Sequence, residues 1–289
     1  DNALGFVIKT PEEGYPLYNG KGRYHAGNTI SLNKSGLRGD GKFDYLTSVT
    51  QSNDYVFFPD SMNTYANTFE LPRTISEYEF PSVSGATVYE HWRPYQDVLM
   101  VQKESENLVM YDAQMYLSGH IYLSPDGLTG GGRTQLDDSE LTADLYSFYL
   151  NDFESDTADF RLNRSDLDAI AFESVNLQTE IDLLQRTGTF QSNGSGSFVS
   201  FPENQYICYI DQLKWFMDQN HVELGASEYG DGSKFVSLHP EQDSLRFVST
   251  SAFYSLENYI IEAGGVKEII VADAEIYPEN GDVVVETNA

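Results

Sequence analysis

Apolar and polar residues alternate along most of this chain. Many apolar residues come in pairs separated by one position, as in Ile121-Tyr122-Leu123, Tyr146-Ser147-Phe148 and Phe160-Arg161-Leu162. Side chains of a β-strand point alternately to opposite faces, so each pair marks a strand with one buried face. Gly, Asn, Asp and Pro separate these pairs, as is typical of turns. The pattern predicts an all-β fold with few helices.

Two segments fit more than one period. In 205–221, Tyr206, Ile210 and Leu213 follow helical spacing, while Ile207, Tyr209 and Leu213 follow strand spacing. The aromatic and β-branched neighbours favour strands. Residues 176–186 are similarly ambiguous and are compatible with a short helix.

The chain also carries an internal repeat. Ile30-Ser31-Leu32 and the following Gly36-Leu37-Arg38-Gly39-Asp40-Gly41 recur 91 positions later as Ile121-Tyr122-Leu123 and Gly127-Leu128-Thr129-Gly130-Gly131-Gly132. Over 42 positions paired at this offset, 11 are identical, whereas chance predicts about two or three. The shared residues are apolar strand positions and turn glycines, which indicates a copied structural unit.

The repeat predicts how the chain is divided. We expect a lead-in segment over 1–27, a first β-repeat unit over 28–120, a second over 121–221 and a partial third over 222–289. Units of this kind bury their apolar faces by stacking. The predicted architecture is therefore a β-solenoid (β-helix) or a stacked β-roll, with sandwich modules left open.

Charge narrows the classes of partner. The 289 residues include 45 acidic and 17 basic ones, for a formal net charge of −28. Such a chain repels phosphate backbones and anionic membranes, which argues against nucleic-acid binding. No apolar run is long enough for a membrane-spanning helix. We expect a secreted, cell-surface or periplasmic protein.

Catalytic and cofactor motifs are absent from the sequence. It contains no His-Glu-x-x-His, Walker loop, Gly-x-Ser-x-Gly elbow or EF-hand loop. The single cysteine, Cys208, lies in an apolar run and is expected to be a buried thiol. Acidic pairs such as Asp137 and Asp138 are interpreted as solvated loops. We expect no cofactor, no metal and no catalytic residues.

One stretch outside the repeat stands out. Val88 to Asp97 holds Trp92 between Tyr89 and Tyr95, next to Pro94. On a loop stiffened by proline, these aromatic rings would form a platform for a sugar or a partner protein. Burial in the core explains the same residues, because large aromatic side chains are usually buried.

The repeat segments resemble large secreted β-repeat proteins of Gram-negative gut-type bacteria. The resemblance covers most of the chain, and the segments that carry it are 36–46, 121–132, 144–160, 202–215 and 271–278. It implies a cell-envelope location and an OstA-like β-roll or β-helix. It assigns no catalytic residue.

Together these observations predict a non-enzymatic envelope or surface repeat protein that acts as scaffold, adhesin or stalk. The alternative is a carbohydrate-binding or carbohydrate-cleaving module that uses Trp92, Tyr95 and Tyr89. The expected partner is a glycan or another surface protein. The sequence leaves the oligomeric state open.

Overall fold

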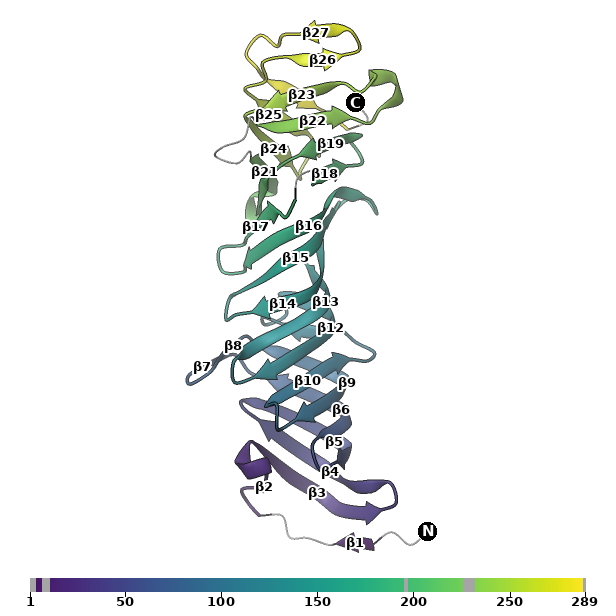
Figure 1. Ribbon diagram of the computed structural model, residues 1–289, viewed down its shortest axis with the longest axis vertical. Coiled ribbons are helices and arrows are strands. Elements are labelled where there is room, and N and C mark those ends of the chain that lie inside the picture. Colours follow the sequence, from purple (N-terminus) through teal and green to yellow (C-terminus); the bar gives the residue numbers. More distant parts are fainter. Residues whose placement is uncertain (1–3, 7–10, 195–196, 226–231, 288–289) are drawn as a thin grey trace. The chain divides into compact units, whose positions relative to one another are not determined.

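The computed structural model describes residues 4–6, 11–194, 197–225 and 232–287 (Figure 1). Within these ranges the only helical elements are three short 3-10 segments, Tyr18–Gly20, Met217–Gln219 and Pro240–Gln242. The all-β prediction is confirmed. The coil of a β-helix is not confirmed, because the coils of a β-helix stack in parallel, whereas the strands described below pair in antiparallel fashion.

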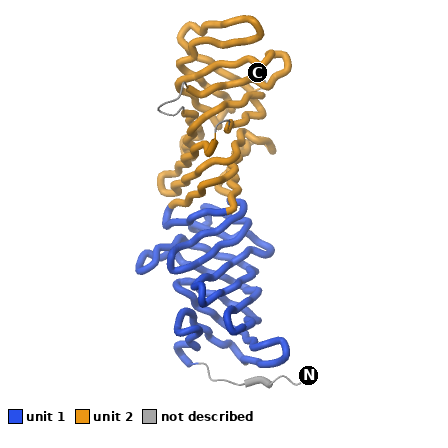
Figure 2. The backbone as a smooth tube through the Cα atoms, in the orientation of Figure 1, with its two compact units in different colours: residues 1–134, 145–151 blue, residues 135–144, 152–289 orange. Residues whose placement is uncertain are grey.

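The chain divides into two compact units (Figure 2). Unit 1 comprises residues 1–134 and 145–151, and unit 2 comprises residues 135–144 and 152–289. The predicted division into a lead-in segment and three repeat units stays a prediction. Regular structure does begin before residue 28, since strand β2 (Tyr15–Leu17) pairs with strand β3 (Gly22–Asn33).

Long antiparallel strands form the first part of unit 1. They follow one another along the chain and pair in that order, and they are β3, β4 (Gly36–Tyr45), β5 (Ser48–Phe57), β6 (Met62–Leu71) and β9 (Val83–Arg93). A small hairpin, β7 (Thr74–Ile75) and β8 (Glu79–Phe80), lies between β6 and β9 in the sequence. Alternate residues face inward, and rings such as Tyr24, Phe43 and Tyr55 fill the core.

Strand β9 forks. Its residues 88–93 pair with β10 (Val98–Lys103), while Val83 and Ser84 pair with β11 (Leu108–Met110). Strand β12 (Met115–Ser124) then pairs with both β10 and β11 and closes the fork. The segment around Trp92 is therefore part of a strand, and the predicted loop begins only after Arg93.

Several strand bounds recur at the offset of the sequence repeat. Strands β4 and β5 correspond to β13 (Gly127–Leu136) and β14 (Ser139–Phe148), each 91 residues later. The order of buried and exposed side chains along β5 and β14 agrees at nine of ten positions. The turns agree as well, because the Ser48 hydroxyl donates to the Tyr45 carbonyl at 2.8 Å and the Ser139 hydroxyl to the Leu136 carbonyl at 2.7 Å.

The last glycine of each repeated motif has a special backbone. Gly41 has a φ of +135° and Gly132 a φ of +131°, a backbone conformation that residues other than glycine rarely adopt. A Cβ atom would lie 2.0 Å from the His25 carbonyl oxygen at Gly41 and 2.5 Å from that of Ser118 at Gly132. These glycines allow two strands to approach closely.

Unit 2 starts from a second forked strand. Strand β15 (Asp152–Asn163) pairs with β16 (Ile170–Asp182). Residues 177–182 of β16 then pair with β17 (Thr187–Ser192), whereas Glu173 and Ser174 pair with β18 (Phe198–Phe201). Unlike the fork at β9, this one stays open, and it starts two separate series of paired strands.

The two series grow by hairpins added in turn. The first series runs through β17, β20 (Gln212–Phe216), β21 (His221–Gly225), β24 (Ser251–Ser255), β25 (Ile261–Gly264) and β28 (Val283–Val285). The second runs through β18, β19 (Tyr206–Tyr209), β22 (Ser233–Ser237), β23 (Arg246–Ser249), β26 (Ile269–Val271) and β27 (Ala274–Ile276). Strands β19 and β20 confirm that 205–221 is mainly extended, with one 3-10 segment at its end.

Candidate functional site

The three aromatic residues predicted as a platform do not lie together on the surface. Trp92 is fully buried, with its ring 5.3 Å from Tyr18 and 4.9 Å from Phe43. Tyr95 is 71% exposed, and Tyr89 is partly exposed on strand β9. Because Tyr89 and Trp92 are three positions apart on one strand, they point to opposite faces. Trp92 thus belongs to the core, the alternative that the sequence left open.

Tyr89 instead belongs to an outward surface across four strands of unit 1, here called the tyrosine face. The strand register places two rows side by side. Each row takes one residue from each of β6, β9, β10 and β12, in that order. The first row is Tyr65, Tyr89, Gln102 and His120. The second row is Asn63, His91, Met100 and Tyr122.

Ring contacts hold the tyrosine face in place. The rings of Tyr65 and Tyr89 lie 5.1 Å apart, and those of His120 and Tyr122 also lie 5.1 Å apart. His91 hydrogen-bonds the Asn63 amide through Nδ1. Tyr65 is 68% exposed. The face therefore offers fixed aromatic rings, next to amide groups that can donate and accept hydrogen bonds.

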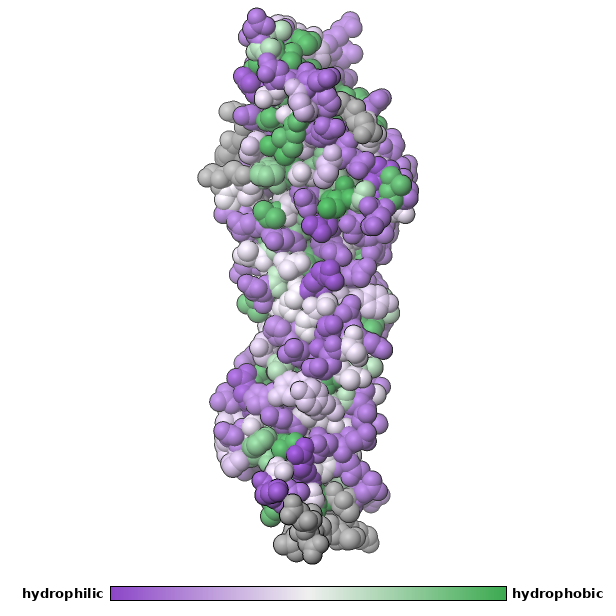
Figure 3. Space-filling model, turned by 90° about the vertical axis from the view of Figure 1, so that its right-hand side faces the viewer, coloured by the Kyte–Doolittle hydropathy of each residue, from purple (hydrophilic) through white to green (hydrophobic). Residues whose placement is uncertain are grey.

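The eight residues of the tyrosine face include no acidic, lysine or arginine side chain, and Arg93 follows His91 on the same side of β9. Burial, followed by the charge of nearby Arg93, lowers the pKa of His91. Figure 3 shows one side of the molecular surface, on which hydrophilic residues predominate. A face of aromatic rings and amides suits an uncharged ligand with both apolar and hydroxyl surfaces.

Most of the tyrosine face could not be predicted from the sequence. Alternation along β6 and β9 indicates that Tyr65 and Tyr89 share an outward orientation, and this signal was available. The pairing register that brings His120 and Tyr122 beside them depends on the fork at β9. The alternation of residues along one strand does not specify this register between strands.

The acidic pairs take part in ordinary structural contacts. Asp137 forms an ion pair with Arg186 at 2.6 Å, and the Asp159 carboxylate accepts a hydrogen bond from the Asn176 backbone at 3.1 Å. Burial, followed by repulsion from Asp182, raises the pKa of Asp152. Across the described ranges, no group of three or more His, Cys, Asp or Glu residues is arranged to hold a metal ion.

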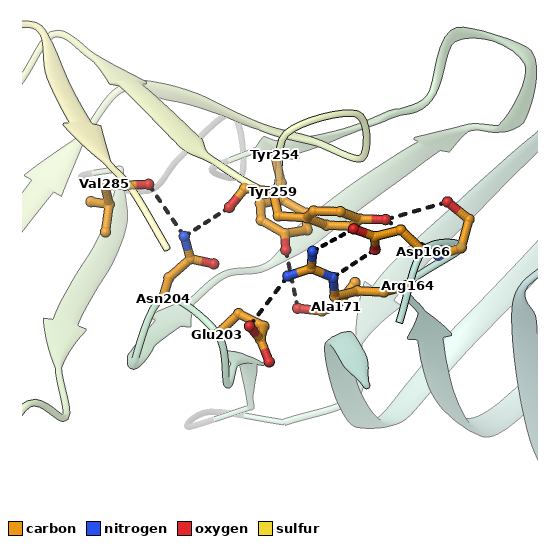
Figure 4. A network of polar contacts seen from close by, with 9 residues as sticks. Arg164, Asp166, Ala171, Glu203, Asn204, Tyr254, Tyr259 and Val285 are labelled. Carbon is orange, nitrogen blue, oxygen red and sulfur yellow. Dashed lines mark hydrogen bonds and ion pairs between the residues drawn. The ribbon is translucent and has the colours of Figure 1, made fainter. Parts of the chain in front are cut away.

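A denser polar network lies inside unit 2 (Figure 4). Arg164 donates two hydrogen bonds to Asp166, at 2.9 and 2.7 Å, and one to Glu203 at 3.2 Å. Its guanidinium carbon lies 3.9 Å above the centre of the Tyr259 ring. Arg164 lowers the pKa of Asp166 to about 2 through these hydrogen bonds. The network ties the loop after β15 to the turn between β24 and β25.

Asn204 extends this network to the last described strand. Its side-chain nitrogen donates to the carbonyl oxygens of Tyr259 at 2.9 Å and Val285 at 3.2 Å. Asn204 is fully buried, as is Tyr254, whose hydroxyl donates to the Ala171 carbonyl at 3.3 Å. These contacts are internal, and their arrangement is that of a structural clamp rather than of a binding site.

Comparison with known proteins does not assign the chain to a family. No family model, curated protein or solved structure matches the chain. In the part of the chain that the structure describes, no helix is long and apolar enough to cross a membrane.

Proposed function

We propose that this protein is a non-enzymatic repeat scaffold of the cell envelope or cell surface, and that it acts as an adhesin by binding a neutral saccharide. The scaffold part of the proposal is supported by the recurrence of strand bounds, burial order and turn contacts at an offset of 91 residues. Copied units of this kind build extended binding surfaces from a small set of contacts.

The tyrosine face carries the saccharide part of the proposal. A sugar ring has an apolar face, which stacks on aromatic rings, and hydroxyl groups, which pair with amides and imidazoles. Tyr65 and Tyr89 supply adjacent rings, and Gln102 and Asn63 supply amides. The lack of formal charge on this face favours a neutral saccharide over a charged partner.

A glycan array tests this proposal. We expect the purified chain to bind one class of neutral oligosaccharide, and Tyr65→Ala and Tyr89→Ala each to weaken binding by about tenfold, since an aromatic stack contributes about 1 kcal/mol or more. Tyr277→Ala is the matched control, because Tyr277 is 66% exposed and lies in unit 2. Binding that is insensitive to both face variants, or no binding at all, contradicts the proposal.

The location is tested separately. In the cell of origin, limited proteolysis of intact cells should degrade the protein if it is displayed on the surface. Degradation only after lysis would argue for an internal location and against the adhesin role.

A further inference from the structure

A groove of about 790 Å³ crosses the outward face of the first strand series in unit 2. Its lining comes from β21, β24, β25 and β28 and the turns beside them. Small residues explain the hollow, because Gly225, Ser251 and Gly264 each lie two positions along from a larger outward residue on their own strands. Those larger residues form the raised row beside the hollow.

In the raised row, Phe253 lies between Glu223 and Glu262, and Lys214 of β20 lies on the far side of Glu223. Phe253 on β24 lies opposite Glu223 on β21 and opposite Glu262 on β25. Side chains at directly opposed positions start about 5 Å apart, so Glu223 and Glu262 start on either side of Phe253. Phe253 is 39% exposed, and its ring is therefore open to a ligand from solvent.

Unit 2 contains an internal example of a cation bound by an aromatic ring and two carboxylates. Arg164 lies over the Tyr259 ring while its guanidinium group bonds the carboxylates of Asp166 and Glu203 (Figure 4). One planar cation thus stacks on an aromatic ring and pairs with two acids, a geometry that suits arginine better than lysine. Phe253, Glu223 and Glu262 offer the same kinds of partner on an open surface, where the Glu223 carboxylate also lies 3.8 Å from His221 Nε2.

Charge supports the comparison. The residues lining the groove include four acids, Glu223, Glu257, Glu262 and Asp282, and neither lysine nor arginine. Elsewhere in unit 2, Lys214 lies 5.0 Å from the centre of the Phe216 ring and Lys234 lies 5.8 Å from that of Tyr209. Among the described side chains, no such cation is recorded over Phe253.

We infer that this groove binds an extended segment of a partner protein through an arginine side chain, which stacks on Phe253 and pairs with Glu223 and Glu262. The inference goes beyond the saccharide proposal and uses residues of the other unit. The hollow formed by Gly225, Ser251 and Gly264 leaves room for the partner's backbone beside the arginine.

Fluorescence anisotropy with a labelled eight-residue peptide tests the inference. The probe contains two arginines among glycines and serines, and matched probes carry citrulline or lysine instead. At an ionic strength of about 0.15 M, which screens diffuse attraction, we expect the arginine peptide to bind and the uncharged citrulline peptide not to bind. Phe253→Ala should weaken binding about fivefold, and Glu262→Gln by a similar factor.

Two control variants separate the groove from general attraction to an acidic protein. Phe198→Ala removes another exposed ring of unit 2, and Glu70→Gln removes one exposed carboxylate of unit 1. Each should change binding less than twofold. Equal losses in these controls, or equal binding of the citrulline peptide, would overturn the inference.

A neutral oligosaccharide provides the remaining comparison. Saccharide binding that is lost in Phe253→Ala, with no binding of the arginine peptide, would also overturn the inference. Failure of the saccharide proposal is distinguishable, because it is read from Tyr65→Ala and Tyr89→Ala, which leave the groove intact.

Discussion

Glu90 is fully buried, and its carboxyl group accepts a hydrogen bond from the Thr50 hydroxyl at 2.8 Å. Thr50 is fully buried as well, so the pair lies inside the core of unit 1. Burial raises the pKa of Glu90 to about 8, although the hydrogen bond from Thr50 acts in the opposite direction. Such a group is protonated in the folded chain at neutral pH and ionised in the unfolded chain.

This difference makes the stability of unit 1 depend on pH. The folded-state pKa lies above the unfolded value, so the stabilisation by protonated Glu90 is complete at low pH and is lost as the pH rises toward 8. Between pH 6 and 9 we expect a loss of about 3 kcal/mol, because stability falls by about 1.4 kcal/mol per pH unit only up to the folded-state pKa of about 8. Glu90→Gln should abolish that loss in urea unfolding curves, and Glu70→Gln should retain it. A parallel pH dependence in the wild type and Glu90→Gln would contradict the assignment.

The close approach at Gly41 and Gly132 gives a second prediction. Gly41→Ala and Gly132→Ala should each destabilise the chain by about 2–4 kcal/mol, because the new Cβ collides with a backbone oxygen and φ is positive. Gly36→Ala and Gly127→Ala are matched controls with positive φ and no atom within 4 Å of the new Cβ. They should cost only about 1 kcal/mol. Thermal unfolding of the four variants checks the difference.

Arg164 should contribute more to stability than a surface arginine. Its side chain is only 11% exposed, and it holds two carboxylates and a ring together. We expect Arg164→Ala to cost about 2–3 kcal/mol, because Glu203 loses its partner and the Tyr259 ring loses its cation. Arg164→Lys should fall in between. Arg161→Ala, which breaks an exposed ion pair with Glu173 at 3.2 Å, should change stability by less than about 0.5 kcal/mol. Equal effects at both arginines would argue against the clamp.

Cys208 should report the unfolding of unit 2. The thiol is fully buried on β19, and burial raises its pKa well above the ordinary value. Because the thiolate is the reactive form, we expect alkylation at pH 8 to be at least about 100-fold slower in the folded chain than in urea. Mass spectrometry after timed alkylation measures both rates. Rapid alkylation of the native chain would show that β19 is accessible.

The sequence predicted the class of structure better than its surfaces. Alternation identified strands even in the ambiguous segment around Ile207 and Leu213, because period two follows directly from strand geometry. The same rule does not say which of two alternating sets is inside. Trp92 and Tyr89 were grouped on a predicted loop, whereas a strand separates them onto opposite faces.

The pairing of strands far apart in the sequence also could not be predicted. The two forks arise because different parts of β9 and β16 find different partners, as when Glu173 pairs with Ser200 while Glu180 pairs with Thr189. Neither local propensity nor the 91-residue repeat specifies that choice. The tyrosine face and the groove both depend on register set by such pairings, so neither was visible from the residues alone.

The open fork at β16 has a consequence for how this part of the chain can change in evolution. Each new hairpin needs only the preceding hairpin of its own series as a template, as β24 needs β21 and β22 needs β19. Contacts between neighbours therefore remain short in sequence, which keeps contact order low as the protein lengthens. Duplication or deletion of a hairpin pair would preserve every earlier register, so the number of pairs is free to vary without redesign of the interior.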